Sequence, residues 1–127
     1  MAADIKHMLD LDLLSKPQIT SVLDSALVYK DILNSDMKKQ DELRGKIVVT
    51  LFYEASTRTR MSFEEAGKIL GSDVINVSAS GSSVEKGESL VNTAKTIEAM
   101  NVDAVVIRHT HSGAPYILAD QFASASV

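Results

Sequence analysis

The stretch KIVVTLFYEASTRTRMSFEEAG, Lys46–Gly67, joins an apolar run to a dense polar cluster. Its first part, Lys46–Tyr53, is a continuous run of β-branched and aromatic residues, which is typical of a strand buried on both faces of a sheet. From Thr57 to Leu70 the apolar residues recur at helical spacing, and Gly71 is placed to end that helix. The arginines, threonines and serines between the two elements therefore lie in a strand-to-helix turn.

The same alternation of strand and helix continues along the chain. We predict an earlier helix from Ser15 to about Leu33, because Ser15 and Gln18 have the spacing of a capping box. The other predicted elements are strands at Asp73–Val77 and Asp103–Ile107 and helices at Glu88–Met100 and Ala114–Phe122. This order predicts a doubly wound α/β fold, with a parallel sheet flanked by helices on both faces. We expect the apolar helix positions, Met61 and Phe63 among them, to be core residues.

Length and composition limit the class of protein. The 127 residues suffice for one domain, 1–127, and 45% hydrophobic and 24% charged residues are ordinary globular values. The net charge of −4 argues against nucleic-acid binding. No apolar stretch approaches the ~18 residues of a membrane span, so we expect a cytoplasmic protein. Because cysteine is absent, disulfides, thiolate metal sites and a cysteine nucleophile are excluded.

A polar cluster follows each of the three predicted strands, at the carboxyl end of the strand. They are the S-T-R-T-R motif at 56–60, the serine-rich loop that contains Lys86, and the pair Arg108-His109. Ligands of parallel α/β sheets bind beyond these strand ends. A helix N-terminus with hydroxyl groups and an arginine is suited to hold a phosphate group, and Arg58 is the first candidate ligand. The clusters therefore predict a site for a small phosphate compound.

Each cluster also has a structural interpretation. The arginines can pair with Glu64 or Glu65 on the helix surface, which suits Arg60 better than Arg58. Lys86 can be an ordinary solvated lysine. The histidines at 109 and 111 lack an evident third metal ligand, so His109 fits better as a polar wall of the pocket or a loop histidine. Neither a Walker A motif, a G-x-G-x-x-G motif nor a G-x-S-x-G motif is present, and we expect no cofactor and no covalent nucleophile.

Three segments resemble the transcarbamoylases. FYEASTRTRMSFE, Phe52–Glu64, is similar to the carbamoyl-phosphate motif of that family over more than ten consecutive positions. SSVEKGESLVNTAKTI, Ser82–Ile97, and VDAVVIRH, Val102–His109, are similar to the mobile loop, the following helix and the third strand of its aspartate branch. The ornithine branch is the alternative, since it shares S-T-R-T-R. Glu54-Ala55, Lys86-Gly87-Glu88 and Arg108-His109 favour the aspartate branch.

The resemblance implies a function for each polar cluster. It implies a metal-free transfer of the carbamoyl group from carbamoyl phosphate to the amine of aspartate, with release of phosphate, in pyrimidine synthesis. The residues implied to surround the phosphate are Ser56, Thr57, Arg58 and Thr59. Thr59 and Arg108 also reach the carbamoyl oxygen, and Arg60 is more structural. Ser82 and Lys86 are implied to enter the pocket of a neighbouring subunit, which makes the catalytic unit a homotrimer, and regulatory or other pathway chains are possible partners.

The sequence also departs from the family pattern. Family members are roughly twice as long and carry a second, aspartate-binding domain. Their histidine-proline-threonine-glutamine motif is absent here, and their fourth strand would begin near Val127. We therefore interpret the chain as a carbamoyl-phosphate-binding domain truncated near its fourth strand. We expect the chain alone to bind carbamoyl phosphate weakly and to be catalytically inactive. A non-catalytic binding or assembly fragment, or an unrelated phosphate-binding α/β domain, is the alternative.

Overall fold

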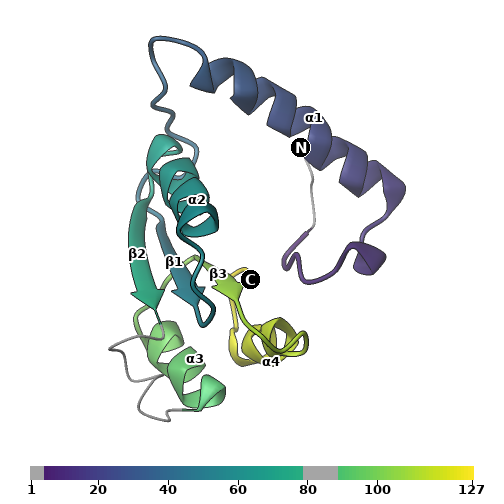
Figure 1. The fold of residues 1–127 in the computed structure, drawn as a ribbon, viewed down its shortest axis with the longest axis vertical. Helices are drawn as coiled ribbons and strands as arrows, with labels where there is room; N and C mark the ends of the chain where they lie inside the picture. The colour runs from purple at the N-terminus through teal and green to yellow at the C-terminus, as the bar shows by residue number, and fades with distance from the viewer. Residues whose placement is uncertain (1–4, 79–88) are drawn as a thin grey trace.

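The computed structural model describes residues 5–78 and 89–127. Figure 1 shows the arrangement of its helices and strands. In chain order these are η1 (Leu11–Leu13), α1 (Lys16–Leu33), β1 (Ile47–Phe52), α2 (Thr57–Ile69), β2 (Asp73–Ser78), α3 (Leu90–Ala99), β3 (Ala104–Arg108) and α4 (Ala114–Gln121). The predicted order of strands and helices is confirmed.

A three-stranded sheet with the order β2-β1-β3 forms the centre of the protein. Both pairings are parallel, with Ile47 opposite Asp73 and Val48 opposite Ala104. Because β1 has a strand on each side, five of its six residues are buried, as the unbroken apolar run predicts. Ser126 forms an isolated parallel bridge with Ala104 at the outer edge of β3, near the place where the family resemblance predicts a fourth strand.

The two faces of the sheet are covered differently. On one face Val49 and Leu51 belong to a buried cluster with Ala94 and Ile97 of α3 and Leu118 of α4. On the other face α2 lies against β1 and β2 (Figure 1). The prediction of helices on both faces of a parallel sheet is therefore confirmed.

Two glycines define how α2 lies against the sheet and where it ends. A methyl group added at Gly67 would lie 2.7 Å from Val74 Cγ2 and 3.0 Å from Ser72 Oγ, so only glycine permits this approach of α2 to β2. Gly71 follows the helix with φ of +95°, a left-handed conformation that favours glycine. The prediction that Gly71 ends the helix is confirmed.

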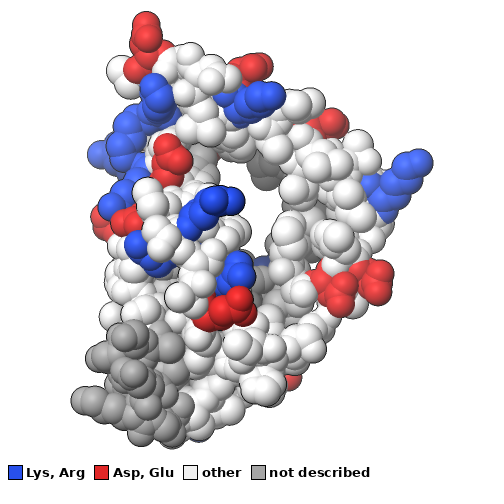
Figure 2. Space-filling view, viewed as in Figure 1, with Lys and Arg blue, Asp and Glu red and all other residues white. Residues whose placement is uncertain are grey.

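Helix α1 forms as predicted but lies away from the sheet. Ser15 Oγ accepts from the Gln18 amide and Gln18 Oε1 accepts from the Ser15 amide, so the predicted capping box is present. None of its residues is buried, and Leu23 and Leu27 are 61% and 63% exposed. Figure 2 shows an open hollow between α1 and the α2 side of the protein. The apolar spacing therefore predicted the helix correctly but not its burial.

The expectation that Met61 and Phe63 are core residues was wrong. Their exposed fractions are 56% and 45%. They lie on α2, whose one buried residue is Gly67, so the helix packs most closely on the sheet at that glycine. Phe63 lines an open cavity beside β1 and β3, where none of the described residues covers it completely. Within the described ranges 5–78 and 89–127, none of the helices combines the length and apolar character that crossing a bilayer requires.

The first described residues are held against the last ones. Lys6 Nζ donates to the Ala123 carbonyl at 2.9 Å, and the Val127 amide donates to His7 Nδ1 at 3.1 Å. The Met8 amide in turn donates to the Val127 carbonyl at 2.8 Å. The burial of His7, with a smaller effect of the Lys6 charge, lowers the pKa of His7 below the ordinary histidine value. The ring is therefore neutral at neutral pH, as an Nδ1 acceptor requires.

Candidate anion-binding site

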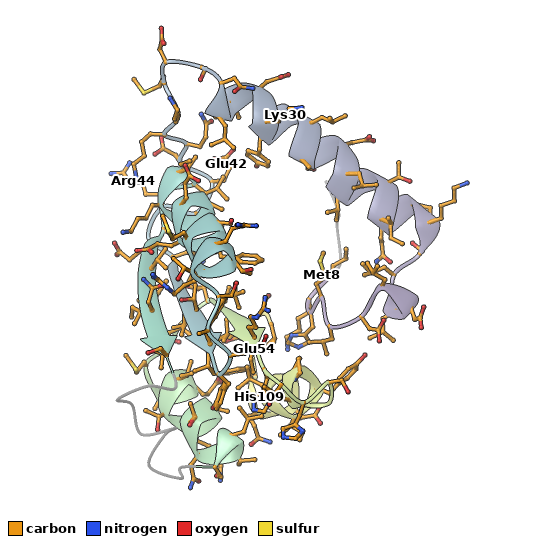
Figure 3. The ribbon with its side chains drawn as sticks, in the orientation of Figure 1. Met8, Lys30, Glu42, Arg44, Glu54 and His109 are labelled. Carbon is orange, nitrogen blue, oxygen red and sulfur yellow. The ribbon has the colours of Figure 1, made fainter. Side chains whose placement is uncertain are left out.

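The candidate site lies where β1 leads into α2, next to the end of β3. Both strands run in the same direction, so their carboxyl ends meet at one edge of the sheet. The Tyr53 amide donates to the Arg108 carbonyl at 2.8 Å and extends this pairing by one residue. Figure 3 shows Glu54 and His109, one from each strand end, at this edge. Parallel pairing thus brings the S-T-R-T-R motif and Arg108 together.

The Thr59 hydroxyl is the common partner of two other predicted site residues. Ser56 Oγ donates to Thr59 Oγ1 at 2.9 Å, and Arg108 Nη1 donates to the same oxygen at 3.4 Å. A threonine hydroxyl has two acceptor positions and one proton. With both acceptor positions engaged, the Thr59 proton remains available for a further acceptor.

The first turn of α2 lacks the side-chain cap that begins other helices of the protein. Ser15 caps α1 and Ser89 caps α3, each through its side-chain oxygen. Ser56 occupies the same position in α2 but makes no side-chain cap hydrogen bond, and its hydroxyl donates to Thr59. Helix α4, which follows Gly113, also has no side-chain cap. The first-turn amides and the positive end of the helix dipole are therefore directed at a position suited to an anion.

Arg108 has donor capacity beyond its contacts with protein groups. Its Nη2 pairs with Glu54 Oε1 at 3.0 Å, and both side chains are partly exposed. Its Nε is buried and has no hydrogen-bond partner among the residues that the structure describes. An unsatisfied buried donor carries a free-energy cost that a bound anion would remove.

Thr57 and Arg58, also predicted to contact the phosphate, are exposed at the start of α2. The Arg58 side chain lines a shallow depression on the outer surface of α2 with Ser62 and Glu65. In the described part of the chain, no hydrogen bond or ion pair links the Arg58 guanidinium to the cluster of Ser56, Thr59 and Arg108. The ligand role of Arg58 stays a prediction.

Arg60 has the structural role that its spacing from Glu64 suggests. Arg60 Nη1 pairs with Glu64 Oε2 at 3.2 Å, and Lys68 pairs with the other oxygen of the same carboxylate at 3.0 Å. Hydrogen bonds from Lys68 and then Asn76 hold the pKa of Glu64 below its ordinary value, so the carboxylate stays charged. The interpretation of Arg60 as a surface-pairing residue is confirmed.

His109 lies against the β1 end of the site. Its ring centroid is 4.5 Å from that of Tyr53 and 5.4 Å from that of His111. Its Nδ1 accepts from the His111 amide at 2.9 Å. Burial, and then the neighbouring His111, lower the pKa of His109. In residues 5–78 and 89–127 no group of three or more histidine, aspartate or glutamate side chains is placed to hold a metal ion.

A cavity of about 460 Å³ adjoins Thr59 and Arg108. Phe52, Phe63 and Val127 contribute to its largely apolar lining. Apolar walls reduce the access of water and so strengthen the attraction between charged groups at the margin of the cavity.

Sequence reasoning did not identify Glu54 and Tyr53 as parts of this site. Their position in the sequence could have indicated a role in the site. Both residues directly follow β1, at the carboxyl end of the sheet, where ligands of parallel sheets bind. Two other predicted ligands, Ser82 and Lys86, lie outside the described residues, and their roles stay predictions.

A central parallel strand that leads into a helix without a side-chain cap, with an arginine on the neighbouring strand, is an arrangement typical of α/β domains that bind anions. Comparison with known families makes the assignment specific. The family model described as "Aspartate/ornithine carbamoyltransferase, carbamoyl-P binding domain" matches residues 6–127, and the chain belongs to this family. The resemblance to the transcarbamoylases is confirmed.

Similar sequences point to the aspartate branch. The aspartate carbamoyltransferase catalytic subunit of Heliobacterium modesticaldum is 55% identical over 119 residues, which cover 94% of this chain and 38% of that protein. The corresponding subunit of Roseiflexus castenholzii is 50% identical over 117 residues, which cover 92% of this chain and 37% of that protein. The chain thus spans somewhat more than a third of the length of these relatives.

Solved structures of both branches share the fold. The match to the catalytic subunit of M. jannaschii aspartate transcarbamoylase covers 96% of this chain and 40% of the matched chain, with a TM-score of 0.84 and 38% sequence identity. Aspartate transcarbamoylase from Trypanosoma cruzi, in complex with carbamoyl phosphate, matches 95% of this chain and 37% of its own, with a TM-score of 0.84 and 27% identity. Anabolic ornithine carbamoyltransferase from Campylobacter jejuni matches 97% of this chain and 38% of its own, with a TM-score of 0.79 and 28% identity.

Proposed function

We propose that this chain is the carbamoyl-phosphate-binding part of an aspartate carbamoyltransferase. The observation that carries the proposal is the Thr59 hydroxyl, which lies between Ser56 and Arg108 at the uncapped start of α2. It is supported by the family of the chain and by relatives named as aspartate carbamoyltransferase catalytic subunits.

The geometry suits the two ends of carbamoyl phosphate. The phosphate group would lie against the first-turn amides of α2, with Ser56, Thr57 and Arg58 around it. The carbamoyl oxygen would lie at Thr59 and Arg108, since their free proton and guanidinium are the donors closest to the apolar cavity. Preorganised donors at this oxygen stabilise the negative charge that develops when the carbonyl is attacked.

The proposed reaction is a direct transfer. The aspartate amine nitrogen forms a bond to the carbamoyl carbon, and the bond from that carbon to the phosphate oxygen breaks. The departing phosphate takes the proton that the nitrogen loses. Thr59 and Arg108 hold the carbonyl oxygen through the tetrahedral state, and the start of α2 holds the departing phosphate. The remaining proposals follow the family resemblance: a cytoplasmic homotrimer in pyrimidine synthesis, with Ser82 and Lys86 serving a neighbouring subunit.

Titration calorimetry with a stable phosphonate analogue of carbamoyl phosphate tests the first step. We expect saturable binding that weakens roughly 10- to 100-fold in Arg108→Ala, which removes a hydrogen bond from a charged group, and about two- to tenfold in Thr59→Ala, which removes one between neutral groups. Arg44→Ala is the matched control, since Arg44 lies before β1 at the opposite end of the sheet (Figure 3). Absence of binding to the folded chain, or equal loss in all three variants, contradicts the proposal and favours a non-catalytic assembly fragment.

A further inference from the structure

The segments that follow β1 and β3 are joined by a pair of rings as well as by an ion pair. The Tyr53 ring packs against the His109 ring, with the centroids 4.5 Å apart and the ring planes tilted by 46°. Tyr53 directly precedes Glu54 and His109 directly follows Arg108, and Glu54 and Arg108 form an ion pair. The backbone adds the hydrogen bond from the Tyr53 amide to the Arg108 carbonyl. The ring pair and the ion pair thus fix the same two segments relative to each other.

A second contact fixes the plane of the His109 ring. The His111 amide donates to His109 Nδ1 at 2.9 Å, so this nitrogen carries no proton. A neutral imidazole that accepts at Nδ1 carries its proton on Nε2. The contact with the Tyr53 ring and the hydrogen bond together hold His109 in one tautomer and one orientation.

We propose that His109 is a positioning residue of the anion site: its neutral ring fixes Arg108 toward the ligand, and protonation of the ring weakens anion binding. The inference rests on the proposed function, which supplies the anion. It goes further by assigning a role to a residue that touches neither Thr59 nor the start of α2 in any described contact.

The local charges explain why protonation opposes this role. A proton on Nδ1 would face the His111 amide proton, so the hydrogen bond would be replaced by a repulsive contact of two donors. The imidazolium would also lie beside the ring of His111, and the neighbouring carboxylate of Glu54 is already paired with Arg108. Burial and His111 lower the pKa of His109, in agreement with a ring that is neutral when the site is in use.

Two substitutions separate the two contacts of the ring. His109→Asn places an amide oxygen near the position of Nδ1 and keeps an acceptor, but it removes the ring contact with Tyr53. His109→Phe keeps a ring against Tyr53 and removes the acceptor. His111→Ala is the control, because it keeps the backbone amide that donates to His109 and removes only the third ring.

The experiment measures affinity for the phosphonate analogue between about pH 5 and 8, the range in which histidine titrates. At the upper end we expect His109→Asn and His109→Phe to bind roughly two- to tenfold more weakly than the wild type, and His111→Ala to stay within about twofold. As pH falls, wild-type affinity decreases more steeply than that of either His109 variant. The phosphonate analogue titrates in the same pH range, and its titration affects the wild type and the variants equally. The difference between their slopes of affinity against pH therefore reports the titration of His109.

Nuclear magnetic resonance of the imidazole nitrogens gives a readout that needs no ligand. We expect an unprotonated Nδ1 at neutral pH, and Tyr53 ring signals and Arg108 side-chain signals that shift together with the titration of His109. A protonated Nδ1 at neutral pH, equal pH slopes in wild type and variants, or tighter binding on protonation would overturn the proposal. Failure of the analogue to bind the wild type refutes the proposed function instead, because the resonance measurement still reports on the ring contacts.

Discussion

Arg108 Nη2 lies 3.0 Å from Glu54 Oε1, an ion pair that joins the end of β3 to the segment after β1. The same guanidinium reaches Thr59 Oγ1 through Nη1 at 3.4 Å. The carboxylate of Glu54 and an incoming anion therefore compete for one cation. The contact with Thr59 is long for a hydrogen bond, so it holds Arg108 less strongly than the ion pair with Glu54 does.

Removing that competition should strengthen anion binding. We expect Glu54→Gln to bind the phosphonate analogue about two- to fivefold more tightly, since exposed ion pairs contribute about 0.2–1 kcal/mol. Calorimetry in low salt measures the effect, and Glu42→Gln, at the other end of the sheet (Figure 3), is the control. Weaker binding of Glu54→Gln would contradict this competition. It would mean that the main effect of the Glu54 carboxylate is to position Arg108 for the anion.

We expect substitution of Arg58 to affect anion affinity and substitution of Arg60 to affect folding stability. We expect Arg58→Ala to reduce affinity for the analogue roughly tenfold or more while leaving the melting temperature unchanged. Arg60→Ala loses the pair with Glu64, so we expect a stability loss of about 0.3–0.5 kcal/mol and affinity within about twofold of the wild type. Calorimetric titration and thermal unfolding of both variants give the comparison. If Arg60→Ala loses the affinity instead, the assignment of the two arginines is reversed.

Gly67 sets the distance between α2 and β2. We expect Gly67→Ala to destabilise the protein by about 1–2 kcal/mol, because its methyl group would lie 2.7 Å from Val74 Cγ2. Urea unfolding measures the change. The control is Gly113→Ala, where a methyl group meets nothing within 4 Å, and its effect should stay within about 0.5 kcal/mol. A double-mutant cycle with Val74→Ala should show coupling, and independent effects would contradict the contact.

The contact between His7 and Val127 should make stability depend on pH. Because the pKa of His7 is lower in the folded state than the unfolded value of 6.5, the folded state favours the neutral ring. Its contribution is complete above about pH 6.5 and decreases as pH falls toward the folded pKa. We expect the wild-type melting temperature to decrease over that interval relative to His7→Asn, which keeps an acceptor but does not titrate. Parallel melting curves for both proteins would exclude this role.

The sequence predicted the elements well where local chemistry determines them. The apolar run of β1, the capping box at Ser15 and the stop at Gly71 each depend on neighbouring residues, and each is present. Burial was predicted less well. The spacing of Leu23 and Leu27 indicates an apolar helix face, but it carries no information about what covers that face, and both side chains are exposed.

The candidate site was predictable to the extent that it follows from strand direction. Thr59 and Arg108 meet because parallel strands end at one edge of the sheet, and that rule needs only the order of elements. Glu54 was missed because a carboxylate has no obvious place beside an anion site. The direction of the Arg58 side chain depends on rotamers and on the surface of α2, which residue types alone do not determine.

The parallel sheet also implies an order of folding. Within the β1–β2 pairing, Thr50 and Asn76 are 26 residues apart, whereas Ile47 and Asp103, which meet where β1 lies beside β3, are 56 residues apart. Closing the longer loop costs about 0.6 kcal/mol more in chain entropy, so β1, α2 and β2 should assemble before β3 joins them. The start of α2 is then present in the early nucleus without Arg108. Competence to bind an anion should accordingly arise in the last kinetic phase of refolding.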